Sequence, residues 1–358
     1  MSYNSYITEK VEKYKTFFQD KSPGQILVLI CPYTFDIDYT RWGIEDRPLN
    51  SWNFQTDVRE YIEYNVRKLR CFLNYTKDLD NDYMPSVSGA LGIGINSAYF
   101  SGADITIGSE TSWVHPVIHD WEDMDKLKLQ RDNRWFQILW EMTSHIVDLC
   151  EGEYAPASHN HFAPFDMANA LRGNQLFYDF YDDPDKVHEL MNISADAIIW
   201  LEMELRKLVK PVLGGTISGS MWLPGGAPFM SEDATDLCSA DIYREFGFSY
   251  TQKVIDAFGG AYIHHHAKGM HVHSEIAKLN GLKTLEISWD PNCPKPIENL
   301  KKIYGWNGDL PLQTRCTVAE VYERIEDLKQ GRMVLMLNVT SLDEAREAVK
   351  FIRKHSSI

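Results

Sequence analysis

The chain has 358 residues, of which 44% are hydrophobic and 24% charged, and its formal net charge is −15. This composition is ordinary for a globular protein with a sizeable core. The negative charge argues against binding to nucleic acid or to an anionic membrane surface. The six cysteines form no C-x-x-C pair, the N-terminus is polar, and no apolar run approaches the roughly 20 residues of a membrane helix. We therefore expect a cytoplasmic protein without a membrane span.

The first part of the chain contains several predicted helices and less distinct strands. Residues 1–24 are expected to form an N-terminal helical extension, and Gln25–Ile30 is typical of a buried first strand. The remaining elements follow in chain order: helical patterns at 56–75, 122–150 and 185–210, and candidate strands at 86–94 and 214–222.

The last third of the chain alternates strands with helices. Strand-like runs lie at Tyr262–His266, Lys283–Ser288 and Arg332–Val339. Thr317 with Glu320, and Ser341 with Glu344, form capping boxes that start two helices, and Gly331 ends the first of these helices. Strand, helix, strand and helix in succession predict a parallel sheet with right-handed crossovers.

These elements favour an α/β protein of one domain. We predict a single (β/α)8 TIM barrel over residues 25–358, preceded by the helical extension. A doubly wound open sheet is the alternative, because the same alternation of elements is compatible with both folds.

The histidine run of "AYIHHHAKGMHVH" is the strongest candidate site. Side chains at i and i+2 share one face of a strand, so His264 and His266 should point together and His265 away from them. Two neighbouring imidazoles suit a zinc site, whereas the alternative is a strand end wetted by solvent. His271 and His273 are expected at the start of the next helix, in a solvated role and without contact to the metal.

Two polar residues on later strands could complete this site. Glu286 alternates with Leu285 and Ile287 in "TLEIS", so its carboxylate should enter the space beside the histidines. A buried carboxylate requires a partner, and a cation would supply one. Asn338 ends the last predicted strand and is a candidate ligand or substrate contact.

Three stretches of the chain resemble the uroporphyrinogen decarboxylase superfamily, especially its corrinoid-dependent methyltransferase branch. "HFAPFDMANALRG" is similar to the family's Gly-x-Pro segment and helix, and "EDATDLCSADIYREFGFSYTQKVIDAFGGAYIH" to its acidic pair, helix and Gly-Gly-x-x-Ile-His strand. "CTVAEVYERIEDLKQG" resembles its Gly-Thr-Pro-x-x-Val helix. The resemblance covers Gln25 to Lys354 and implies a single (β/α)8 barrel.

The resemblance also implies a zinc site and a corrinoid partner. The family's methyltransferases bind zinc with His-x-Cys on this strand, a carboxylate about one βα unit later and a Cys on the last strand. Here His264 matches the His, His266 replaces the first Cys, Glu286 stands for the carboxylate, and Asn338 occupies the region of the last Cys. Such a site is harder than one with thiolates, so a small O- or N-methylated substrate suits it better than a thiol.

The cobalamin that accepts the methyl group would come from a partner. The chain has no D-x-H-x-x-G corrinoid motif, because His264 stands where the aspartate should be. A corrinoid protein is therefore the expected partner, and whether the chain is a homodimer is left open.

Porphyrinogen decarboxylation itself is not expected. The family's arginine-rich segment corresponds here to "CPYTFDIDYTRWG", in which Arg41 is the one arginine. A tetrapyrrole with several carboxylates requires several cations. The alternative to a methyltransferase is a metal-independent decarboxylase acting on a smaller carboxylic acid, with Asp82 or Asp166 and an arginine.

The sequence offers further candidate residues, some of them supported by the family match. Three carboxylates are candidate catalytic groups: Asp82, Asp166 and Glu232. A solvated loop is the alternative for Asp82, and a helix cap is the alternative for Glu232 or for its neighbour Asp233. The candidate substrate contacts, besides Asn338, are Trp222, Arg172 and His161. Simple packing is the alternative for Trp222, and a structural ion pair is the alternative for Arg172.

Overall fold

The computed structural model describes residues 3–358, which form an α/β protein with a large parallel sheet. Within these residues the sheet has seven strands, ordered β1-β13-β12-β11-β10-β9-β6, and each pairs in parallel with its neighbours. The strands are β1 (Ile26–Leu29), β6 (Asn160–Phe162), β9 (Phe229–Ser231), β10 (Ala261–His266), β11 (Leu282–Ser288), β12 (Leu312–Thr317) and β13 (Met333–Asn338). The parallel sheet that the alternating elements predict is confirmed.

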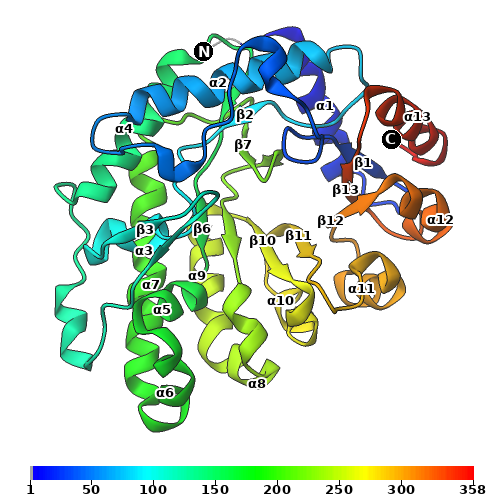
Figure 1. Ribbon diagram of the computed structural model, residues 1–358. Helices are drawn as coiled ribbons and strands as arrows, with labels where there is room; N and C mark the ends of the chain where they lie inside the picture. The colour runs from blue at the N-terminus through cyan, green and yellow to red at the C-terminus, as the bar shows by residue number, and fades with distance from the viewer. Residues whose placement is uncertain (1–2) are drawn as a thin grey trace.

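Helices surround the sheet, and α11, α12 and α13 follow one another along the outside of its C-terminal strands (Figure 1). The longer helices are α1 (Ser5–Gln19), α2 (Val58–Tyr75), α4 (Arg134–Leu149), α7 (Pro184–Leu205), α9 (Phe248–Phe258), α12 (Val318–Leu328) and α13 (Leu342–His355). The shorter ones are α3 (Ile95–Ser101), α5 (Pro164–Arg172), α6 (Leu176–Asp182), α8 (Ala240–Ile242), α10 (His273–Ile276) and α11 (Leu300–Asn307). None of the helices described here is long and apolar enough to cross a membrane.

The first predicted capping box forms in full, whereas the second forms only in part, because the Glu344 carboxylate accepts from the Thr340 amide and not from the Ser341 amide. The Thr317 side chain accepts a hydrogen bond from the Glu320 amide, and the Glu320 carboxylate accepts one from the Thr317 amide. Ser341 likewise accepts from the Glu344 amide at the start of α13. These caps satisfy backbone donors that the first helical turn leaves free.

Several predicted boundaries in the first two thirds of the chain are wrong. Residues 214–222 form an antiparallel hairpin, β7 (Gly215–Ser218) and β8 (Met221–Pro224), because Gly219 and Ser220 both have positive φ and turn the chain. Residues 122–150 are a short 3₁₀ turn followed by α4, which Asn133 caps. The remaining short strands are β2 (Ser86–Val87), β3 (Ile105–Ile107), β4 (Ser112–Val114) and β5 (Ala155–Pro156).

A separate two-stranded sheet, β2 with β5, lies between segments that contact the two ends of the large sheet. The backbone amide of Asp82, just before β2, donates to Val28 O in β1 at 2.8 Å. On the same edge of β1, the Asn81 side chain accepts from the Ile30 amide at 2.9 Å. Next, β2 pairs in parallel with β5, which lies a few residues before β6 in the chain.

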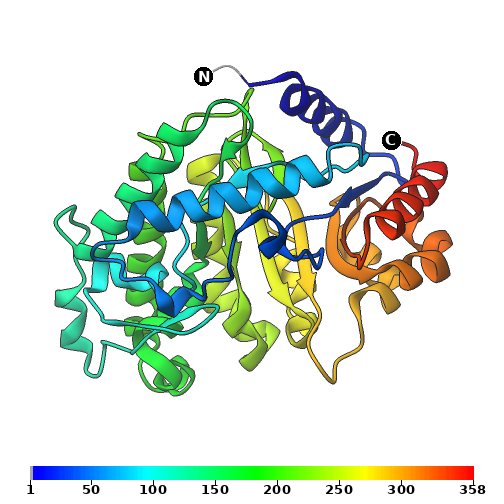
Figure 2. The ribbon, with the colours of Figure 1, turned by 45° about the horizontal axis from the view of Figure 1, so that its top comes forward.

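The N-terminal helix belongs to the same core as the rest of the protein. Its buried residues Ile7, Val11, Tyr14 and Phe17 join one cluster of buried hydrophobic side chains that extends to Ile352. Both views place α1 close to α13 (Figures 1 and 2). The predicted extension is thus a helix that packs on the sheet domain.

Candidate metal centre

His264 and His266 lie on the inner face of β10, as strand alternation predicts. Their ring centroids are 5.1 Å apart, and Tyr262 precedes them on the same face. His265 points to the opposite face, where it is fully buried. Its Nε2 lies 2.7 Å from Nδ1 of His273, in the layer between the sheet and the outer helices.

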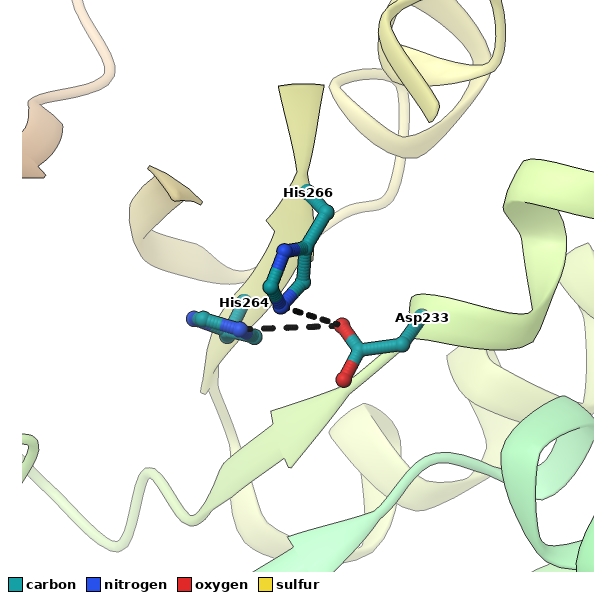
Figure 3. Close-up of side chains that lie close together, drawn as sticks. All are labelled: Asp233, His264 and His266. Carbon is teal, nitrogen blue, oxygen red and sulfur yellow. Dashed lines mark ion pairs between the residues drawn. The ribbon is translucent and has the colours of Figure 1, made fainter. Parts of the chain in front are cut away.

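Asp233 faces the two histidines from the end of the neighbouring strand (Figure 3). It follows β9, which pairs with β10 so that Ser231 lies beside His264. Asp233 Oδ1 is 3.6 Å from His264 Nε2 and 3.8 Å from His266 Nε2. One ligand atom from each of the three residues lies within 4.8 Å of the other two. Asp233, His264 and His266 therefore form a potential metal-binding triad.

Each histidine has its own further carboxylate beside its other ring nitrogen, Nδ1. His264 Nδ1 lies 3.1 Å from Glu286 Oε2, and His266 Nδ1 lies 2.9 Å from Asp290 Oδ1. The His266 contact is a hydrogen bond, whereas His264 Nδ1 lies beside Glu286 without hydrogen-bond geometry. With an Nδ1–H turned to each carboxylate, both Nε2 atoms face Asp233. Metal-binding histidines commonly have this arrangement, in which an outer carboxylate fixes the tautomer and the ring orientation.

The charge balance at the triad favours a cation. Asp233 Oδ1 is shielded from solvent and has no hydrogen-bond partner within residues 3–358. Burial raises the pKa of Asp233, although His264 and His266 oppose the rise. Burial lowers the pKa of His264, but the Glu286 and Asp233 carboxylates outweigh burial and raise that pKa to about 9. The same surroundings that hold a proton on His264 also favour a divalent metal ion, which would bind beside the unpaired carboxylate oxygen after the His264 Nε2 proton is lost.

Asp166, predicted as a catalytic group, positions the Asp233 segment. Its carboxylate accepts hydrogen bonds from Ser231 Oγ at 2.8 Å and from the backbone amides of Asp233 at 2.9 Å and Ala234 at 2.7 Å. These three bonds hold the turn that follows β9. Asp166 therefore acts on the site through the backbone of Asp233.

Glu232, the other predicted acid of the adjacent pair, points away from the triad. It is fully buried and accepts hydrogen bonds from Thr251 Oγ1 at 2.6 Å and Tyr243 Oη at 3.2 Å. Burial raises its pKa to about 8. Glu232 thus lies in the layer between β9 and the helices.

Asp82 and Arg172 make structural ion pairs. The buried Asp82 carboxylate contacts Lys13 Nζ at 2.7 Å and Arg353 Nη2 at 2.9 Å, and it accepts from the Val28 amide at 2.7 Å. Arg172 donates to Asp179 at 2.7 Å. Both side chains are engaged away from the triad, so the structural alternative given for Arg172 matches the geometry.

The remaining predicted substrate contacts do not gather at the triad. His161 is buried and lies 2.9 Å from Glu202 Oε2, and Trp222 is buried with its Nε1–H donating to Val212 O at 2.7 Å. Asn338 ends β13 in an exposed position. The expected solvation of His273 is wrong, because His273 is buried between His265 and the Asn307 amide.

Two cavities flank the triad. One, of about 720 Å³, is lined by His264 and Glu286 and continues to Tyr262, Phe229 and Arg315. The other, of about 470 Å³, is lined by Asp233 and opens between several exposed apolar side chains, among them Ile93, Trp113 and Leu237. The triad is therefore accessible from a tyrosine-rich space on one side and from an apolar opening on the other.

The sequence did not reveal two residues of this site, and it left a third undecided. The pair Glu232 and Asp233 was noted, but the sequence did not indicate which of the two faces the histidines. Asp290 lies two positions after the end of β11. A carboxylate just beyond the end of a parallel strand is a signal that could have indicated this residue from the sequence. Arg315 lies on β12, which the sequence pattern did not reveal as a strand.

No protein-family model matches the chain, and a comparison with curated proteins finds no significant match. The resemblance to the uroporphyrinogen decarboxylase superfamily therefore depends on the motifs quoted above.

Proposed function

We propose that this chain is a zinc-dependent methyltransferase that moves a methyl group between a small O- or N-methylated substrate and a corrinoid protein. The observation that supports this proposal is the arrangement at the triad, where Asp233 Oδ1 lies 3.6 and 3.8 Å from the Nε2 atoms of His264 and His266. Zn²⁺ bonds of about 2.0–2.2 Å in a tetrahedral site require ligand atoms roughly 3.3 Å apart. Small side-chain movements would bring the three atoms to that spacing and leave a fourth position for substrate.

The proposal includes a closed (β/α)8 barrel. Support comes from the contacts between the ends of the seven-stranded sheet: Asp82 N donates to Val28 O, β2 pairs with β5, and the segment of β5 continues into β6. With β2 and the β5–β6 segment counted as two strands, eight strands would form the ring. The triad would then lie at the carboxyl ends of the barrel strands, where the active sites of such barrels are found.

The protein's own residues would bind and orient the reactants. Glu286 and Asp290 hold the imidazole rings, and Asp166 holds the Asp233 turn. A bound zinc ion would supply Lewis acidity to the heteroatom that carries the methyl group. In this proposal Asp233 is the third ligand and Glu286 is the orienting group of His264, which revises the ligand set expected from the sequence.

The metal-independent decarboxylase is less well supported by the geometry. Its two expected acids, Asp82 and Asp166, are both saturated by structural partners. For a polycarboxylate tetrapyrrole, which the sequence does not predict, the described residues that line the larger cavity offer few cations, Arg315 and Lys68. Arg41 instead lies over the rings of Trp42 and Tyr75.

Metal content tests the first half of the proposal. The purified protein should contain close to one zinc ion per chain, and H264A, H266A and D233N should contain little. The control H265A removes an imidazole from the opposite face of the same strand and should retain the metal. Equal zinc in all four variants, or none in the parent protein, would refute the metal site.

Methyl transfer tests the second half. The protein with zinc but without a corrinoid protein should transfer no methyl group, and the addition of a cob(I)alamin-loaded corrinoid protein should start transfer from O- or N-methyl donors. Decarboxylation or methyl transfer by the isolated chain would contradict the proposal.

A further inference from the structure

The larger cavity is lined by Arg315, an exposed arginine of β12 that makes no ion pair with the described residues. Arg315 lines the same cavity as His264 and Glu286, and within residues 3–358 no carboxylate lies in ion-pair distance of its guanidinium. The contact recorded for it is with Tyr33, whose ring centroid is 5.5 Å from Cζ. A guanidinium that faces a cavity without a carboxylate is available to an anionic ligand.

The strand register places Arg315 on the same inner face as the histidines. His264 lies beside Glu286 of β11, and Glu286 lies beside Gln313 of β12. Arg315 is two residues beyond Gln313, so its side chain points to the same face but one layer nearer the carboxyl end of the strands. Arg315 is therefore across one strand from the triad and at the level of its open side.

The other charged groups of this cavity are engaged. Glu286 contacts His264 Nδ1 at 3.1 Å and also accepts hydrogen bonds from Tyr262 and Ser288. Lys68 lies 3.7 Å from an Asp46 carboxylate oxygen and over the Tyr39 ring. Arg315 is thus the one cation of this cavity without an ion pair among the described residues, whereas Lys68 has a long one with an exposed carboxylate.

The walls of the cavity are aromatic. Five tyrosines and one phenylalanine line it: Tyr33, Tyr39, Tyr61, Tyr83, Tyr262 and Phe229. Aromatic walls bind flat rings through stacked or edge-to-face contacts while their hydroxyl groups remain able to hydrogen-bond. A cavity of about 720 Å³ accommodates such a ring together with a carboxylate.

We infer that the substrate is a monocarboxylate with a flat apolar body, bound with its carboxylate on Arg315 and its reactive end toward His264 and His266. This inference rests on the proposed function for the identity of the reactive end, but the Arg315 contact itself requires neither metal nor corrinoid. One unpaired arginine matches one carboxylate, and its planar fork favours a bidentate contact.

Calorimetric titration with matched probes tests the inference. The probes are 4-methoxybenzoate and its neutral isostere 4-methoxybenzamide, together with methoxyacetate and methoxyacetamide as a pair without a ring. Each is titrated into the full-length protein with and without zinc, because a carboxylate could also bind the metal directly. The variants are R315Q, R315K and, as a matched control, R324Q, in which the arginine removed lies on the outer helix α12 and near Asp327.

The metal-free parent protein should bind 4-methoxybenzoate roughly 10- to 100-fold more tightly than the amide, because a charge-assisted contact is lost in the amide. R315Q should abolish this preference, R315K should retain a fraction of it, and R324Q should leave it unchanged. Methoxyacetate should bind more weakly than 4-methoxybenzoate because it has no ring.

Three results would overturn the inference: equal binding of acid and amide, no binding of either acid, or a preference that survives R315Q. Circular dichroism and zinc content of R315Q check that the variant is folded. A chain that binds no zinc but prefers the acid through Arg315 would refute the proposed function and support the anion site. Conversely, zinc binding without any dependence on Arg315 would refute this inference alone.

Discussion

Substitution of Glu286 by glutamine distinguishes an orienting carboxylate from a metal ligand. The Glu286 carboxylate is buried and lies 3.1 Å from His264 Nδ1. In E286Q an amide oxygen can still lie beside Nδ1, so the change replaces a charged contact by a neutral one. That replacement costs about 1–1.5 kcal/mol, which corresponds to roughly a 10-fold weaker zinc affinity.

The zinc affinity of E286Q is compared with that of two further variants, D290N and D233N. D290N makes the same change behind His266, whose side chain is 33% exposed against 16% for His264, so its effect should be smaller. D233N removes a proposed ligand and should cost more than the roughly 10- to 100-fold typical of outer-shell changes. Competition with a chromophoric chelator at fixed pH measures all three affinities. A loss in E286Q as large as in D233N would make Glu286 a ligand, and an unchanged affinity would show that the Nδ1 contact has no role.

Two further predictions concern stability. Burial raises the pKa of Glu202, but the hydrogen bond and charge of His161 and the charge of Arg206 outweigh burial and lower that pKa to about 2. Because this lies below the ordinary value of 4.5, ionised Glu202 should stabilise the fold above about pH 4.5 by roughly 3 kcal/mol, a contribution lost as the pH falls toward 2. In urea unfolding, the difference in stability between wild type and E202Q should thus be largest at pH 6, smaller by roughly 2 kcal/mol at pH 3, and absent only below about pH 2. A difference that stays constant with pH would contradict the ion pair. A chain that ends at Gly331 lacks β13 and α13, so β1 and β12 are each left unpaired on one edge. This chain should show no cooperative unfolding transition. A soluble, cooperatively folded monomer would contradict the pairing of β13 with both strands.

The elements that could be predicted from the sequence are those set by local signals. The capping box of Thr317 and Glu320 involves residues three positions apart, so it is visible in any short window. The common face of His264 and His266 follows from the two-residue period of a strand. The hairpin at Gly219 and Ser220 could not be predicted in the same way, because a non-glycine residue with positive φ gives no pattern in the sequence.

The parts of the site that the sequence did not reveal depend on contacts between distant segments. Asp233 faces the histidines because Asp166, far away in the chain, binds its backbone amide. The choice of the ring nitrogen that Glu286 contacts depends on side-chain rotamers, which strand alternation does not determine. β12 was missed because Gln313 and Arg315 alternate with Thr314 and Cys316, which is not the apolar run expected of a buried parallel strand.

The pairing of the first strand with the last has a consequence for how the chain is made. Ile26 of β1 pairs with Met333 of β13. At a synthesis rate of about 5–20 residues per second, roughly 15 to 60 s pass between the synthesis of β1 and that of β13. An unpaired strand edge in a nascent chain invites aggregation. The opposite edge of β1 is covered much sooner, because Asn81 and Asp82 accept from the amides of Ile30 and Val28. Tyr14 of α1 in turn donates to Asp82 O, so the first 82 residues contain contacts that can shelter β1 while the ribosome completes the sheet.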